Sequence, residues 1–162
     1  MHPTTSMAVM IKQKKITLVQ QMAALKRTFP ESHVNYDYRQ KRLVWEGILQ
    51  PTTLSKKYKV KITCDGISSI DYKPNIYVIS PKPLSLAENE KKLPHTYDSK
   101  QQQICLYDWR CNEWNETMMM SHTIIPWATE WLYFYEIWVA TGEWYGGGHH
   151  SSPSTEKTKK AL

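Results

Sequence analysis

Residues 57–64 alternate strictly between polar and apolar side chains, and this short stretch constrains the fold more than any other. Lysines and a threonine separate its apolar positions, which are Tyr58, Val60, Ile62 and Cys64. Successive side chains of a β-strand point to opposite faces, so a period of two predicts a strand with one buried and one solvent-exposed face. The dipeptide Asp65-Gly66 follows as a turn signal.

A helix is predicted ahead of this strand. Thr17 followed by Gln20 matches a capping box, in which each side chain bonds the backbone N–H of the other residue. Apolar residues then recur at helical spacing, at Leu18, Met22, Leu25 and Phe29. Pro30 closes the segment, because proline cannot continue a helix.

Two further strand-like runs flank the alternating strand. The first, Leu43–Leu49, is an apolar run that Pro51 ends. The second, Asn75–Ser80, is a short apolar run between Pro74 and Pro81. Short apolar runs bounded by proline are typical of strands. The order along the chain predicts a helix followed by a meander of three or four antiparallel strands.

A polar stretch with several prolines, residues 81–103, precedes a second helical pattern. A stretch of this length without secondary structure is uncommon in a compact domain unless it serves a function. Pro126 is a typical helix start and Gly142 a typical helix stop. One face of the predicted helix is aromatic and is interpreted as core, with Trp127, Trp131, Tyr135 and Trp138. Helix, meander, loop and helix together indicate an α+β fold.

Length and composition fit one soluble domain. The chain has 162 residues, of which 41% are hydrophobic and 22% charged, and this composition excludes a disordered chain. We divide it into an arm at 1–13, a folded domain at 14–145 and a Gly/Ser/Lys-rich tail at 146–162. Both ends are predicted to be flexible, and Gly146 to Gly148 are interpreted as a linker after the helix.

A basic chain would favour acidic partners, namely nucleic acid, an anionic membrane surface or an acidic protein patch, but the distribution of charge favours solvated faces instead. The net charge is +6, but the basic residues are spread over the chain rather than gathered in one stripe, so no nucleic acid is required. The most apolar stretch, Ile124–Ala140, is shorter than the roughly 20 residues of a membrane-spanning helix. It also contains Glu130 and Glu136, so we expect no membrane insertion. Residues 1–30 show no secretory signal, so a cytoplasmic protein with free thiols is predicted.

Cys105 is the candidate nucleophile. It lies in an apolar triplet at the end of the long polar loop, where a thiol is expected to be partly exposed yet backed by packed side chains. Cys64 lies on the apolar face of a strand and is interpreted as structural. Cys111 lies in a polar stretch and is the competing candidate, as a secondary or resolving thiol. The position of Cys105, ten residues after His95, favours Cys105 over Cys111 as the nucleophile.

The order of these features resembles the ubiquitin-conjugating enzymes. That family has an N-terminal helix, a four-stranded antiparallel meander, a His-Pro-Asn loop, a catalytic cysteine, a nearby tryptophan and crossing helices. His95 stands where the motif histidine would be, and Cys105 follows ten positions later, which is the family spacing. Trp114 follows at close to the family distance. The resemblance covers roughly residues 14–140 and implies a conjugating-enzyme-like fold with more than one C-terminal helix.

The C-terminal third is more closely similar to one prokaryotic branch. Its aromatic strings at 123–127, 130–136 and 141–144 resemble the stand-alone conjugating subunit of short type II CBASS, the cyclic-oligonucleotide antiphage systems. These subunits are encoded beside a cGAS-like nucleotidyltransferase. The resemblance implies a bacterial acyltransferase that accepts the C-terminus of this cyclase as a thioester on Cys105. The acyl group would then pass to an amine, such as an acceptor lysine, or stay in a regulated covalent complex.

The resemblance also implies roles for residues near the cysteine. Tyr97 replaces the family's motif asparagine, and its phenol can donate a hydrogen bond to a developing oxyanion. Because the geometry differs, thioester formation is better supported than isopeptide transfer. His95 is interpreted as shaping the loop rather than as a base. Asp98 and Asp108 are candidates for orienting or deprotonating an acceptor lysine, with solvated loop carboxylates as the alternative.

Three other classes of function were weighed against this one. A zinc site from His95, Cys105 and Cys111 lacks paired spacings and a fourth ligand. A papain-like hydrolase needs a histidine well after its nucleophile, and the nearest following one is His122. A non-catalytic scaffold that binds the cyclase or another defence protein is the strongest alternative. No metal or organic cofactor is expected, and the sequence leaves the oligomeric state open.

Overall fold

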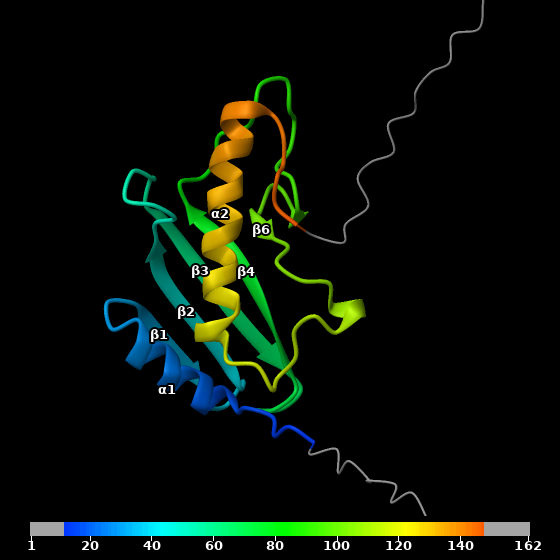
Figure 1. Cartoon of the computed structure of the whole chain (residues 1–162). Coiled ribbons are helices and arrows are strands. Elements are labelled where there is room, and N and C mark those ends of the chain that lie inside the picture. Colours follow the sequence, from blue (N-terminus) through cyan, green and yellow to red (C-terminus); the bar gives the residue numbers. More distant parts are fainter. Residues whose placement is uncertain (1–11, 148–162) are drawn as a thin grey trace, which may run out of the picture.

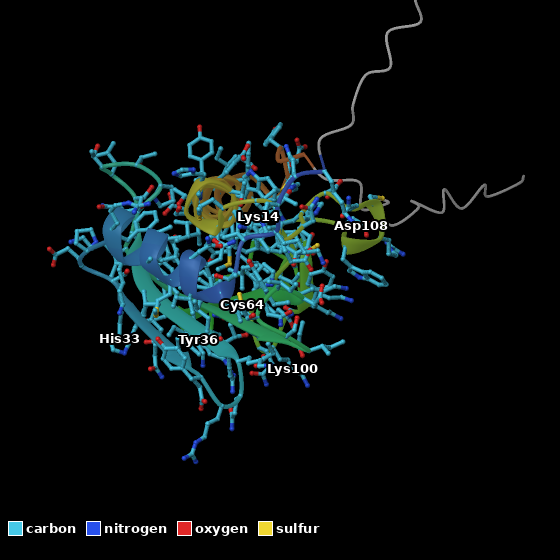
Figure 2. The ribbon with its side chains drawn as sticks, turned by 90° about the horizontal axis from the view of Figure 1, so that it is seen from below. Lys14, His33, Tyr36, Cys64, Lys100 and Asp108 are labelled. Atoms are coloured by element: carbon cyan, nitrogen blue, oxygen red, sulfur yellow. The ribbon has the colours of Figure 1, made fainter. Side chains whose placement is uncertain are left out.

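The computed structural model describes residues 12–147, so most of the predicted arm at 1–13 and tail at 146–162 lies outside the described residues. The chain runs through a helix, a strand meander, a small hairpin, two short 3-10 helices and a long helix. Both α-helices cover the same face of a single sheet (Figures 1 and 2). The predicted α+β fold is confirmed.

The first helix, α1 (Leu18–Thr28), begins where the sequence predicts. The Gln20 backbone N–H donates to Thr17 Oγ1 at 3.2 Å, and the Thr17 N–H donates to Gln20 Oε1 at 2.9 Å. This reciprocal pair satisfies two backbone donors that a helix start otherwise leaves without partners. Leu18 and Leu25 are fully buried and anchor the helix on the sheet.

The sheet has the strand order β1-β2-β3-β4-β6-β5, and every neighbouring pair is antiparallel. The strands are β1 (His33–Asp37), β2 (Arg42–Leu49), β3 (Tyr58–Gly66), β4 (Tyr72–Ser80), β5 (Thr96–Asp98) and β6 (Gln103–Ile104). The alternating residues of β3 bury Val60 and Ile62 against the helices, whereas Lys59 is exposed. The one-sided burial predicted from the period of two is confirmed from Tyr58 to Ile62, but Thr63, which was predicted on the solvent face, is only 4% exposed. It lies in a central strand, between Val44 of β2 and Asn75 of β4.

Two turn predictions are wrong in detail. Asp65-Gly66 lies inside β3 rather than in the following turn. A Cβ on Gly66 would collide with the backbone oxygens of Ser68 and Asp71, so this glycine permits a close approach of the loop. Pro74 lies inside β4 rather than before it. The Pro74 carbonyl points away from β3 and accepts from Tyr107 Oη. An N–H at Pro74 would point to the same side, where β6 pairs only with Ile76 and Tyr77, so the proline costs the sheet no hydrogen bond.

The long helix α2 (Ile124–Thr141) crosses the sheet and ends at Gly142, whose φ of 79° is the left-handed cap predicted for it. The expectation of more than one C-terminal helix is not met in the described residues, where α2 is the one α-helix after Cys105. Only the 3-10 helices η1 (Trp109–Cys111) and η2 (Met120–His122) precede it. Side-chain bonds to the backbone, such as the Thr117 N–H to Asn115 Oδ1 at 3.0 Å, hold this segment in non-helical turns. No helix within residues 12–147 is long and apolar enough to cross a membrane.

Gln21 joins α1 to the segment after the cysteine. Its side chain is fully buried. Its amide nitrogen donates to Tyr72 Oη at 3.0 Å and to the Met118 carbonyl at 2.9 Å. Its amide oxygen accepts from the Met120 N–H at 2.9 Å. One side chain of α1 therefore bonds polar groups of β4 and of the segment that precedes α2.

We expect Gln21→Leu to lower the free energy of unfolding by about 3 kcal/mol, because it leaves buried backbone groups at Met118 and Met120 without partners. Urea unfolding followed by tryptophan fluorescence measures this loss. Gln40→Leu is the matched control, since Gln40 is exposed. Equal stability of the two variants would contradict this role for Gln21.

Candidate active site

Cys105 directly follows β6, the strand that joins the small β5–β6 hairpin to the sheet. Its backbone N–H donates to the His95 carbonyl at 2.9 Å, so the hairpin pairing brings the motif histidine beside the cysteine. The thiol Sγ lies 3.6 Å from the carbonyl oxygen of Tyr107. The residue is only 7% exposed, which is less than the partial exposure predicted from the sequence.

His95 is held from several sides. Its φ of 45° is left-handed, which is uncommon for a residue other than glycine. Its carbonyl also accepts from Trp131 Nε1 at 3.1 Å. Its ring stacks on Trp144, with the ring centroids 4.8 Å apart and 25° between the planes. Trp131 of α2 and Trp144 after it therefore fix the His95 backbone, to which the Cys105 N–H is hydrogen-bonded.

Tyr97 and the thiol meet at the same carbonyl. The Tyr97 hydroxyl donates to the Tyr107 carbonyl oxygen at 2.8 Å, and the Cys105 thiol approaches that oxygen from two residues before it. The phenol is also hydrogen-bonded with Cys105 itself. The side chain is 50% exposed. A hydroxyl donor therefore stands beside the sulfur, at the sequence position of the family's motif asparagine.

The electrostatic surroundings favour the protonated thiol. Burial is the largest effect and raises the pKa of Cys105, because desolvation disfavours the thiolate. The hydrogen bond with Tyr97 and a backbone bond at Tyr107 lower this pKa, whereas the charges of Asp108 and Glu113 raise it. The net direction is upward. The resting state is thus a neutral thiol that reacts when it loses its proton.

An open groove of about 460 Å³ runs beside Cys105. The cysteine contributes to its lining, together with aromatic side chains of α2 and of the segment that follows it. The aromatic residues of α2 and of the following segment that line the groove are Trp127, Trp131, Phe134 and Trp144, and Tyr107 lines it from the cysteine loop. The volume lies in the range of roughly 300–1,000 Å³ that is usual for ligand sites in proteins. Among residues 12–147, those that line this groove include no histidine, so the hydrolase alternative with His122 gains no support.

A comparison with known protein families matches residues 21–151 to the family described as Type II CBASS E2 protein. The chain belongs to this family. Family membership confirms the resemblance predicted from the sequence and supports an E2-like role within a CBASS system. A comparison with curated proteins gives no match.

In this CBASS E2 protein the two candidate carboxylates differ in their surroundings. Asp108 accepts from Arg110 at its backbone N (2.9 Å), Nε (3.1 Å) and Nη2 (3.1 Å), and these bonds lower its pKa to about 2. A carboxylate with so low a pKa is a poor proton acceptor at neutral pH. Asp98 is exposed in the β5–β6 turn, where it accepts from the Gln101 N–H at 3.0 Å. Both carboxylates therefore stabilise local turns.

The other two cysteines lie in contrasting places. Cys64 is fully buried beneath the helices, with its Sγ 3.5 Å from Met120 Sδ (Figure 2), and burial raises its pKa. Cys111 is exposed at the end of η1, and the negative charge of Asp108 raises its pKa. Within the described part of the chain, no three His, Cys, Asp or Glu side chains converge as metal ligands, so His95, Cys105 and Cys111 do not form a zinc set.

The raised pKa of Cys105 predicts how its reactivity depends on pH. Only the thiolate reacts, so the rate of alkylation of Cys105 by iodoacetamide should reach half of its maximum only above about pH 8.5, the ordinary pKa of a cysteine. Peptide mapping by mass spectrometry separates Cys105 from Cys111, which reports the reactivity of an exposed thiol in the same sample. A rate at Cys105 that reaches half of its maximum at about pH 8.5 or below would mean that its pKa is not raised.

Sequence reasoning missed one wall of the groove. Trp144 was seen only as part of a family-like string, and Glu130 only as a charge in an apolar stretch. The spacing of Trp127, Glu130 and Phe134, at three and four residues, places all three on one face of α2 and was the available signal. The fold of the chain after Gly142 had no such signal.

Proposed function

We propose that this CBASS E2 protein accepts the C-terminal acyl group of a partner protein on Cys105. The observation that carries the proposal is the placement of the thiol, which lines an open groove on one side and is bonded to the Tyr97 hydroxyl on the other. The groove gives an acyl chain access to a sulfur that is otherwise buried. A scaffold that only binds has no need of this arrangement.

The chemistry follows from the groups at the sulfur. The Cys105 thiolate attacks the activated carbonyl carbon of the donor, a C–S bond forms, and the activating group leaves with the bonding electrons. The oxyanion that develops at this carbon is stabilised by a hydroxyl donor beside the sulfur. Tyr97 supplies this donor when its O–H, which bonds the Tyr107 carbonyl in the resting state, turns to the oxyanion. An amine that attacks the thioester then forms an amide and releases the Cys105 thiol.

The proposed acyl donor is a cGAS-like nucleotidyltransferase. The support is family membership, because CBASS E2 proteins work with the other proteins of a CBASS system. For the second step, the described residues near the sulfur include Asp108, but Arg110 occupies its carboxylate. Thioester formation is therefore the better supported half of the reaction, and a retained covalent complex is an alternative outcome to transfer.

Co-expression with the neighbouring cyclase tests this function. We expect an adduct of the two chains on non-reducing gels that disappears with excess thiol, and intact-mass spectrometry should give the summed mass less one water. The adduct should be formed by the wild-type chain without added crosslinker. Tight association of the two proteins without any covalent adduct would favour the scaffold.

A further inference from the structure

The only charged side chains among the described residues that line the groove beside Cys105 are acidic. Glu113 and Glu130 line it, and the other described residues of its lining are uncharged. Glu113 already accepts from the Asp108 N–H at 2.6 Å through its Oε2 atom. Glu130 is exposed on α2, between the groove residues Trp127 and Trp131. The carboxylate of Glu130 is therefore the one best placed to meet a ligand.

The aromatic walls suit the same kind of ligand. The faces of indole and phenyl rings carry negative potential and attract the cationic groups of lysine and arginine. The apolar stems of these side chains also pack well on aromatic surfaces. Trp131 and Trp144 lie 5.6 Å apart by ring centroid, and Trp144 lies 6.1 Å from Phe134, so the wall is continuous. A basic side chain finds both aromatic side chains and a carboxylate in the lining of this groove.

Another wall of the groove is formed by the backbone of two glycines. Gly146 and Gly147 line the groove after the helix has ended at Gly142. A Cβ on Gly146 would lie 2.8 Å from Trp144 Nε1 and 3.0 Å from Phe134 Cδ2, so only glycine lets the chain pass so close to the aromatic wall. The thiol is 7% exposed. A donor carbonyl therefore reaches the sulfur only at the end of a slender, extended segment.

We propose that this groove selects donors by an extended, basic C-terminal tail, and that Glu130 is the residue that recognises the charge. The inference rests on the proposed function and names the substrate class for the same cysteine. The net charge of +6 opposes a basic ligand at long range, so the selection arises from carboxylates and rings within the groove. Charge complementarity thus points to a basic tail, and the proposed function assigns this tail to the partner that donates the acyl group.

Peptide thioesters test this selection without an activating enzyme. In this reaction the Cys105 thiolate attacks the peptide thioester, a new C–S bond forms, and the small thiol leaves. Two matched pentapeptides with the same Leu-Gly-Gly end would carry either two arginines or two glutamates before it. The rate of acylation is followed by intact-mass spectrometry for the full chain, for Glu130→Lys and for Glu31→Lys. Glu31 is exposed in the turn after α1 and gives the same change in net charge.

We expect the wild-type chain and Glu31→Lys to react about fivefold faster with the basic peptide, and Glu130→Lys to lose or reverse this preference. Equal rates for the two peptides on the wild-type chain would overturn the selection while leaving the proposed function intact. No acylation of Cys105 by either peptide would instead refute the proposed function. A preference that emerges only when Lys157, Lys159 and Lys160 are replaced by glutamate would overturn the proposal in favour of the chain's own tail as occupant.

Discussion

Replacing Cys105 by serine should eliminate the thiol-sensitive adduct completely and leave a thiol-stable one in its place. A serine oxygen at this position forms an ester, which excess thiol does not cleave under conditions that release a thioester. The alkoxide is far harder to form than the thiolate, so the ester should accumulate slowly, at least about a hundredfold below the wild-type rate. Non-reducing and reducing gels of the co-expressed pair, with intact masses, measure both effects.

Cys111→Ser is the matched control for this experiment. Cys111 is exposed on η1 and does not line the groove, and the charge of Asp108 raises its pKa. We expect this variant to form the adduct at the wild-type rate. If Cys111→Ser removed the adduct and Cys105→Ser kept it, the acyl-carrying thiol would be Cys111. Thermal unfolding of both variants shows whether the buried Cys105 site tolerates the hydroxyl.

The sequence pattern predicted those helices and strands that are specified by neighbouring residues. The alternation in β3 and the capping box of α1 each specify an element within a few residues, and both are confirmed. The four-stranded meander implied by the family resemblance is present as β1 to β4, but the residues of β1 were not located from the sequence, and β5 and β6 were not predicted. Each of β1, β5 and β6 is five residues or shorter and is defined by pairing with a partner strand, for example β6 with β4 through Ile104 and Ile76. Local sequence carries little signal for such pairing.

The residues of the candidate site were predicted from the sequence, but the contacts that hold them in place were not. The spacing of His95, Tyr97 and Cys105 follows from the family resemblance, and the structure brings all three together. The bonds that hold them come from afar in the sequence. Trp131 donates to the His95 carbonyl from 36 residues away, and Trp144 stacks on the same histidine. Contacts between distant residues depend on the complete fold and leave no periodic pattern.

These contacts couple the helix α2 to the segment that carries Cys105. The His95 carbonyl accepts from Cys105 on one side and from Trp131 on the other. The same face of α2 supplies Trp127, Glu130 and Phe134 to the groove. The aromatic helix interpreted from sequence as core therefore has two roles. One part of its surface packs on the sheet, and another part forms the groove and fixes the histidine loop.

Tyr97→Phe is expected to slow thioester formation about a hundredfold at neutral pH while leaving the fold intact. The substitution removes the hydroxyl but keeps the ring, and the side chain is half exposed, so little packing is lost. Two effects add up. Loss of the bond that lowers the pKa of Cys105 leaves less thiolate, and loss of a donor to the oxyanion costs about 10²–10³ in rate where such donors have been removed. Acylation by a peptide thioester measures the rate.

The pH dependence separates these two effects. A raised pKa of Cys105 reduces the thiolate fraction most below that pKa, so this part of the defect shrinks as the pH rises. The loss of the oxyanion donor does not depend on the protonation of the sulfur and should persist at high pH. Tyr38→Phe is the matched control, since Tyr38 is 71% exposed in the turn after β1, and β1 lies at the opposite edge of the sheet from the cysteine hairpin. A wild-type rate for Tyr97→Phe at every pH would show that this hydroxyl only orders the loop through the Tyr107 carbonyl.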